Sequence, residues 1–153
     1  MTSKSFDLAD EAATIRLGQV LGTMVRPGDV LALFGTLGMG KSTLARALIQ
    51  AQTSTDEEVP SPTFTLVQMY EGRDGELWHF DLYRLEKPDD AFELGIEDAF
   101  AAGISLIEWP ERLGGLIPPE RLDVTLSLGD NGGRRAILTS CRQWDERLGE
   151  ITL

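Results

Sequence analysis

Residues 35–43 are the stretch of this chain best suited to chemistry, because a glycine-rich segment leads directly into a lysine and two hydroxyl side chains. The spacing Gly35-x4-Gly40-Lys41-Ser42 is that of a phosphate-binding loop. In such a loop, consecutive backbone N–H groups point inward at an anion, and the following helix N-terminus adds positive potential. The spacing therefore predicts a nucleoside triphosphate as the ligand.

Charge and reach suggest a role for each residue of this loop. Lys41 is expected to contact the β- and γ-phosphate oxygens as a point charge, and the Ser42 hydroxyl is expected to be a ligand of Mg²⁺. Further backbone N–H groups, and one hydroxyl near the α-phosphate, are expected from Gly38, Met39, Gly40 and Thr43.

Two acidic residues follow apolar runs and are candidates for the metal and the attacking water. Glu108 ends the run at 103–108, where we expect it to anchor the metal; the alternative is a surface carboxylate before a turn. Asp81 lies near the end of the run at 76–83 and could position water or hold a magnesium-bound water. It could instead pair with Arg84 at the surface.

Four further side chains could serve either a functional or a structural role. Two prolines stiffen the loop before Thr63, which could sense the γ-phosphate or belong to a purely conformational turn. Trp109 could pack near the nucleotide or simply in the core. His79 lies inside a predicted strand and is interpreted as structural, and Cys141 as a passive, small apolar residue.

The elements that must position these residues follow from periodicity and turn signals. Residues 30–34 read as a buried strand, and Asp10 is the predicted N-cap of a helix that reaches Met24. Further strands are predicted at 6–8, 65–70, 76–83, 103–108, 121–128 and 135–140, and further helices after residue 40 and at 88–94, 96–101 and 144–148.

This order predicts an α/β three-layer sandwich with a mixed, partly parallel sheet and a P-loop NTPase fold. The parallel core contains the strands at 30–34 and 103–108, and antiparallel hairpins extend the sheet at its edges. The nucleotide is expected at the carboxyl ends of the core strands. We interpret residues 1–153 as one domain, with an undefined tail after about residue 142.

Composition narrows the possible functions. The net charge of −11 argues against unaided binding to a nucleic-acid backbone. A single cysteine and a single histidine cannot form a disulfide or a structural zinc site, so a reducing cytoplasm fits. No apolar run approaches the roughly 20 residues that span a bilayer, so no membrane partner is expected.

Four segments, GTLGMGKST at 35–43, SPTF at 61–64, HFDLYR at 79–84 and IEWPE at 107–111, together resemble the TsaE (YjeE) family. The resemblance extends from Asp10 to about Arg135. It implies a bacterial ATPase that is required for threonylcarbamoyladenosine in tRNA, binds ATP and Mg²⁺, and supports turnover of a complex of the TsaD and TsaB proteins. tRNA would then be met only indirectly, through that complex.

The resemblance also implies roles for individual residues. Lys41 and Ser42 carry over as phosphate and Mg²⁺ ligands, Glu108 as the metal-side acid, and Asp81 and Thr63 as catalytic or switch residues. The resemblance further places Trp109 near the nucleotide and Glu11 near the adenine. Ser42 keeps the hydroxyl of the commoner threonine, and Met39 adds bulk beside the phosphates.

Two alternative functions remain open at the level of sequence. A small-molecule P-loop kinase shares the loop and the size, although no acceptor pocket or arginine-bearing lid can be identified. A non-enzymatic partner could use nucleotide only to set its shape, with the loop at 60–64 as the switch. A GTPase is disfavoured because guanine is selected by an Asn-Lys-x-Asp motif. The only asparagine of this chain, Asn131, is followed by Gly132, so the motif is absent.

Overall fold

The computed structural model describes residues 2–153, which form one seven-stranded sheet flanked by helices. The strands are β1 (Thr2–Leu8), β2 (Val30–Phe34), β3 (Val67–Glu71), β4 (Glu76–Asp81), β5 (Ile104–Glu108), β6 (Leu122–Leu128) and β7 (Arg134–Ser140). The helices are α1 (Glu11–Met24), α2 (Lys41–Gln52), α3 (Ile96–Ala102) and α4 (Asp145–Gly149), with 3₁₀ helices η1 (Pro88–Leu94) and η2 (Pro110–Leu116).

The sheet order is β1-β7-β6-β2-β5-β4-β3. The four central strands, β6, β2, β5 and β4, run parallel, and the remaining pairs are antiparallel. The predicted mixed sheet is therefore confirmed. Because parallel strands end at the same edge, the carboxyl ends of β2, β5 and β4 lie next to one another.

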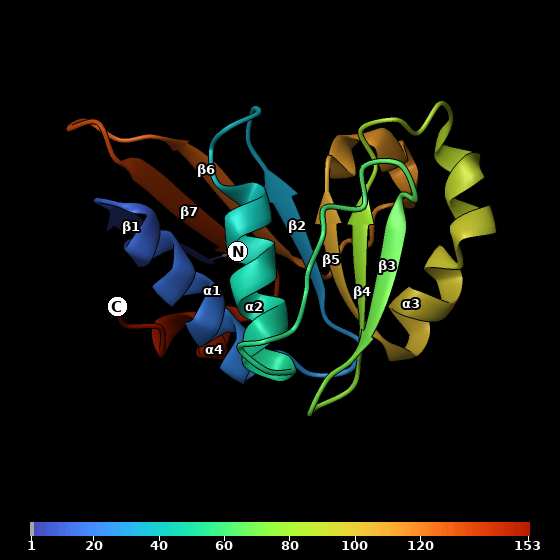
Figure 1. Cartoon of the computed structure of the whole chain (residues 1–153), viewed down its shortest axis with the longest axis horizontal. Helices are drawn as coiled ribbons and strands as arrows, with labels where there is room; N and C mark the ends of the chain where they lie inside the picture. The colour runs from blue at the N-terminus through green and yellow to red at the C-terminus, as the bar shows by residue number, and fades with distance from the viewer. Residues whose placement is uncertain (1) are drawn as a thin grey trace.

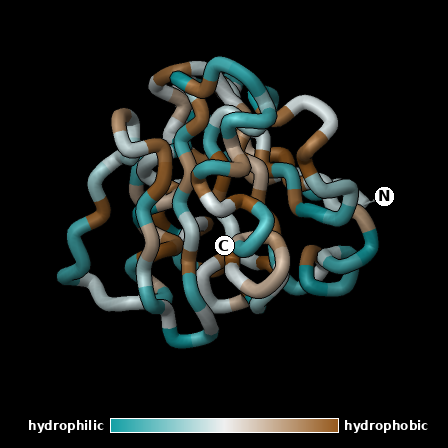
Figure 2. The backbone as a smooth tube through the Cα atoms, turned by 90° about the vertical axis from the view of Figure 1, so that its right-hand side faces the viewer, coloured by the Kyte–Doolittle hydropathy of each residue, from teal (hydrophilic) through white to brown (hydrophobic). Residues whose placement is uncertain are grey.

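The sheet separates two apolar cores, so the molecule has three layers. Side chains such as Leu33 and Leu106 pack with α1 and α2 on one face, and Phe80 and Ile107 pack with η1, α3 and η2 on the other. This division follows from strand geometry, in which successive side chains point to opposite faces. Figure 1 shows α1 and α2 side by side, with α3 at the end of the sheet formed by β3 to β5. In Figure 2, the tube is hydrophobic mainly in its interior segments and hydrophilic along many outer loops.

Helix α1 is fixed at its start and along its length. Asp10 caps it as predicted, with its Oδ1 accepting from the Ala13 N–H at 2.9 Å. Farther along, a Cβ atom on Gly18 would lie only 2.6 Å from the Leu44 carbonyl oxygen. The absence of a side chain there allows α1 and α2 to pack closely.

Several predicted strand boundaries were wrong. The first strand begins at Thr2 rather than at residue 6, because the polar residues before Phe6 pair with β7. β3 begins two residues late because Leu66 has a positive φ of 68°. β4 ends at Asp81 rather than at residue 83.

The helical predictions also need two corrections. The segment at 88–94 is a 3₁₀ helix, and a further 3₁₀ helix, η2, was not predicted. Its start depends on Trp109, whose φ of 59° lies in the left-handed region that sequence patterns seldom indicate for a tryptophan. Within residues 2–153, no helix has both the length and the apolar character needed to cross a membrane.

Candidate functional site

The glycine-rich loop links the carboxyl end of β2 to the first turn of α2. Gly40, the N-cap of α2, has a φ of 106°, which glycine adopts far more readily than a residue with a Cβ atom. Gly35 opens the loop with a φ of 144°. The chain thus forms the strand, loop and helix that the phosphate-binding motif requires.

Lys41 is buried at the base of this loop. The residue is only 5% exposed, yet its Nζ atom has no hydrogen-bond partner among residues 2–153. Burial lowers the pKa of Lys41 below its ordinary value, while the negative charge of Glu108, Glu111 and Asp81 opposes that shift. A desolvated ammonium group without a partner is costly, so the arrangement fits a site that an anionic group completes.

Trp109 provides the contact that Lys41 does make. The Lys41 Nζ lies 3.7 Å from the centroid of the Trp109 ring, within cation–π distance. The Tyr83 ring packs against the same indole at 4.9 Å between centroids. Trp109 therefore lies beside the loop lysine.

Glu108 ends β5 and is buried between two polar partners. Its Oε1 accepts from the Ser42 hydroxyl at 3.2 Å, and its Oε2 lies 2.7 Å from Nε2 of His79. Glu108 is 3% exposed and His79 is 1% exposed. The two residues predicted as metal ligands, Ser42 and Glu108, are thus in direct contact.

Asp81 ends β4 directly beside Glu108, its partner in the parallel register. It is buried, and its Oδ1 accepts from the Tyr83 backbone N–H at 3.1 Å. Arg84 instead lies over the Phe64 ring at 4.7 Å. In the described part of the chain, no salt bridge joins Asp81 to Arg84, so the surface pair considered from sequence is not formed.

One pocket of about 390 Å³ brings together most of the predicted site residues. They come from the loop, from the segment at 60–66 and from the ends of β4 and β5: Lys41, Ser42, Thr63, Asp81, Glu108 and Trp109. Thr63 lies within hydrogen-bond distance of Ser61, with 3.0 Å between the hydroxyl oxygens. Ser61, which was not predicted as a site residue, also lines this pocket.

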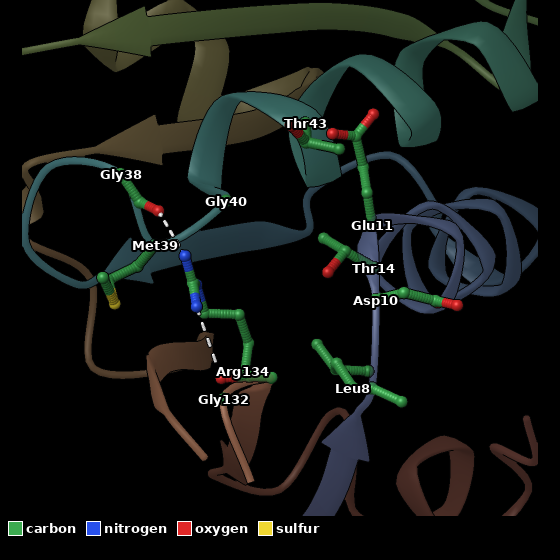
Figure 3. Close-up of a pocket in the computed structure, with 12 residues that line it drawn as sticks. Leu8, Asp10, Glu11, Thr14, Gly38, Met39, Gly40, Thr43, Gly132 and Arg134 are labelled. Atoms are coloured by element: carbon green, nitrogen blue, oxygen red, sulfur yellow. Dashed lines mark hydrogen bonds between the residues drawn. The ribbon is translucent and has the colours of Figure 1, made fainter.

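A second pocket, of about 270 Å³, adjoins the first through the glycine-rich loop. Glu11 and Thr14 contribute from α1, and Met39 from the loop, whereas Arg134 reaches in from the first position of β7 (Figure 3). Gly38, Gly40 and Thr43 line both pockets. The Arg134 guanidinium donates to the Gly38 carbonyl at 3.3 Å.

Neither Arg134 nor Thr14 was predicted from sequence. Thr14 could have been found because it lies one helical turn after Glu11. Arg134 gave no local signal, since it approaches the loop only through the sheet order. Gly35 lines neither pocket and serves the turn at the start of the loop.

The donor types in the first pocket suit a hard cation. Ser42 and Glu108 offer oxygen atoms, which Mg²⁺ prefers. Among the described residues, no group of three or more His, Cys, Asp or Glu side chains forms a metal-binding cluster.

Comparison with known proteins identifies relatives along most of the chain. A family model described as "Threonylcarbamoyl adenosine biosynthesis protein TsaE" matches residues 8–137. A protein from Nostoc sp. named "tRNA threonylcarbamoyladenosine biosynthesis protein TsaE" is 42% identical over 138 residues, covering 86% of this chain and 83% of its own length. A protein of the same name from Bacillus subtilis is 32% identical over 138 residues, covering 90% and 85%.

A solved structure agrees with these matches. The crystal structure of YdiB from Bacillus subtilis superposes with a TM-score of 0.78 at 25% sequence identity, covering 97% of this chain and 93% of that one. The predicted α/β fold of the P-loop NTPase class is therefore confirmed. From the matched residues and the extent of the identity, this chain belongs to the TsaE family.

Proposed function

We propose that this protein acts in tRNA threonylcarbamoyladenosine biosynthesis, the process for which its relatives are named, as a cytoplasmic, Mg²⁺-dependent ATPase. In this proposal it supports turnover of the TsaD and TsaB proteins and does not itself attach the threonylcarbamoyl group. The observation that supports it most is the buried Lys41 ammonium, which lacks a hydrogen-bond partner among residues 2–153.

Lys41 and the loop backbone would bind the triphosphate. The first turn of α2 leaves backbone N–H groups free for an anion, and the helix N-terminus adds positive potential. Lys41 would leave the Trp109 face and form charge-assisted hydrogen bonds with phosphate oxygens. Glu11, with the second pocket around it, would accommodate the nucleoside.

Ser42 and Glu108 would hold the Mg²⁺ ion. When bound, Mg²⁺ offsets the negative charge on the β- and γ-phosphate oxygens. The present contact between the Ser42 hydroxyl and Glu108 Oε1 at 3.2 Å keeps both oxygen donors on the same side of the pocket.

Asp81 and Thr63 would act on the attacking water and the γ-phosphate, respectively. The hydrogen bond from the Tyr83 N–H fixes one carboxylate oxygen of Asp81, and we expect the other to orient the attacking water. Thr63 would contact the γ-phosphate from the proline-rich loop. Both side chains line the pocket that also contains Lys41.

The overall charge fits a role beside partners. With a net charge of −11, the chain is poorly suited to bind the tRNA backbone by itself. Contact with tRNA is therefore expected to pass through TsaD and TsaB.

A reconstituted reaction tests this function. This protein, TsaD, TsaB, tRNA and the threonylcarbamoyladenylate donor should give multiple turnovers only when ATP is present. Lys41→Ala should abolish multiple turnover even when ATP is present, because nucleotide no longer binds. Unchanged turnover without ATP would reject the proposal.

A second function, a nucleotide-dependent switch without a need for hydrolysis, is favoured by one surface feature. Phe64 is 82% exposed and follows Thr63, which lines the pocket. A γ-phosphate contact at Thr63 could therefore move an exposed aromatic side chain. Asp81→Ala separates the two functions: full support of modification without ATP hydrolysis would favour the switch.

A further inference from the structure

His79 occupies a position in β4 that links the sheet to the proposed metal site. Strand alternation places His79 and Asp81 on the same face, two residues apart, while Trp78 and Phe80 pack in the opposite core. The imidazole lies beneath the carboxyl ends of the strands and is almost completely buried. A polar ring in this position needs a hydrogen-bond partner.

That partner is Glu108. The His79 Nε2 atom lies 2.7 Å from Glu108 Oε2, and Glu108 Oε1 accepts from the Ser42 hydroxyl at 3.2 Å. The two oxygens of one carboxylate thus have separate partners. Oε2 faces the imidazole, and Oε1 faces the other proposed metal ligand.

The hydrogen bonds also indicate which ring nitrogen bears the proton. Glu108 Oε2 can only accept when ionised, so Nε2 must donate. Nδ1 has no partner within residues 2–153 and is buried. A proton on Nδ1 would leave a buried N–H unsatisfied, so the neutral Nε2–H tautomer fits the site.

We infer that His79 is a positioning residue for the metal-side carboxylate. It holds Glu108 Oε2 through Nε2–H and thereby keeps Oε1 turned toward Ser42 and the Mg²⁺ position. A hydrogen bond to an outer partner orients metal-ligating side chains in many proteins. This inference rests on the proposed Mg²⁺-dependent nucleotide binding and adds to it the residue that sets the carboxylate orientation.

A matched pair of variants tests this role without measuring catalysis. His79→Gln keeps an N–H donor near the Nε2 position, and His79→Leu removes the donor. A non-hydrolysable ATP analogue is held at fixed concentration while Mg²⁺ is raised, and Trp109 emission reports binding. His79→Leu should need about 10-fold more Mg²⁺ or higher, whereas His79→Gln should recover most of the wild-type response.

The same titration in excess EDTA provides the control. Nucleotide affinity without Mg²⁺ should be nearly the same in all three proteins, because Lys41 and the loop backbone remain in place. An equal Mg²⁺ requirement in wild type and His79→Leu would overturn the inference. Equal losses with and without Mg²⁺ would also overturn it, since they would indicate a purely structural role.

A measurement on the wild-type protein is independent of how the variants fold. The chain contains one histidine, so ¹⁵N NMR of tag-free protein reports His79 alone. The Nε2–H tautomer is expected. An Nδ1–H tautomer would contradict the inference. Failure of wild type to bind nucleotide at all would instead reject the proposed function.

Discussion

Two buried cations lie near opposite ends of β2, and each is in contact with the ring of a tryptophan. Lys41, near the carboxyl end, lies 3.7 Å from the centroid of the Trp109 ring, and Arg147 lies 3.8 Å from that of Trp144. Both residues are nearly fully buried, at 5% and 6% exposure. They differ in their hydrogen bonds.

Arg147 has an ion-pair partner, although its Nε has no hydrogen-bond partner among residues 2–153. Its two terminal nitrogens donate to the carboxylate of Asp29 at 2.7 and 2.9 Å, and one also donates to the Met24 carbonyl at 2.9 Å. This ion pair ties α4 to the segment between α1 and β2. By contrast, Lys41 Nζ has no such partner in the described chain. A buried cation that has an ion-pair partner holds a fold together, whereas one without any hydrogen-bond partner at a loop and helix N-terminus indicates a ligand site.

The largest expected effect concerns Arg147, the cation that has an ion-pair partner. Arg147→Met should lower the free energy of unfolding by about 3–5 kcal/mol, because Asp29 is left buried without its partner. Urea denaturation measures the loss. A loss below about 1 kcal/mol would mean that the Arg147–Asp29 pair contributes little to stability, and the contrast with Lys41 would fail.

Lys41→Met tests the cation that has no hydrogen-bond partner among residues 2–153. Nucleotide affinity should fall at least about 100-fold, or about 2.7 kcal/mol, while the unfolding free energy of the nucleotide-free protein should stay the same or rise. The reason is that the change breaks no hydrogen bond, and removal of a desolvated charge offsets the loss of the cation–π contact with Trp109. Calorimetric titration with an ATP analogue and urea denaturation provide the two values. A stability loss as large as that of Arg147→Met would remove the contrast.

Trp109→Leu sharpens the role of the aromatic ring beneath Lys41. Loss of the cation–π contact should reduce the stability of the nucleotide-free protein by about 1 kcal/mol. The nucleotide-dependent change in tryptophan emission should disappear, because Trp109 is the indole in contact with Lys41. Trp144→Phe is the control and should retain that change in emission. If Trp109→Leu also retains it, the lysine does not move away from this ring.

The smallest effect concerns Asp74, which lies far from the phosphate loop in the turn between β3 and β4. A hydrogen bond from Gln52, at 2.8 Å, and then contacts with Arg73, hold the pKa of Asp74 below its ordinary value. The folded state therefore favours the carboxylate, and this stabilisation is present above the ordinary aspartate pKa. It is lost as the pH falls through the lower folded-state value.

Asp74→Asn should consequently be slightly less stable than wild type at neutral pH, and the difference should shrink in acid. Urea denaturation across this pH range measures the difference, with nucleotide affinity expected to remain unchanged. A difference that grows as the pH falls would contradict the assigned direction.

Local chemistry made much of the site predictable. Asp10 indicates the start of a helix, Gly40-Lys41 indicates a phosphate loop, and Glu108 ends an apolar run. Each signal lies within a few residues of the feature that it predicts. The proposed roles of these residues in binding and catalysis stay predictions.

Other features depend on which strands become neighbours, and no local signal reports that. His79 meets Glu108 only because β4 and β5 lie side by side in parallel with a fixed register. Arg134 reaches Gly38 across 96 positions of sequence. The 3₁₀ helix η2 likewise depends on a left-handed backbone at Trp109 that tertiary packing must stabilise.

A crystal structure with a non-hydrolysable ATP analogue and Mg²⁺ tests the central claim most directly. We expect Lys41 Nζ to lie within about 3 Å of phosphate oxygens and away from the Trp109 ring, with the phosphates enclosed by the loop backbone. A nucleotide bound elsewhere, with the lysine still resting on the indole, would contradict it.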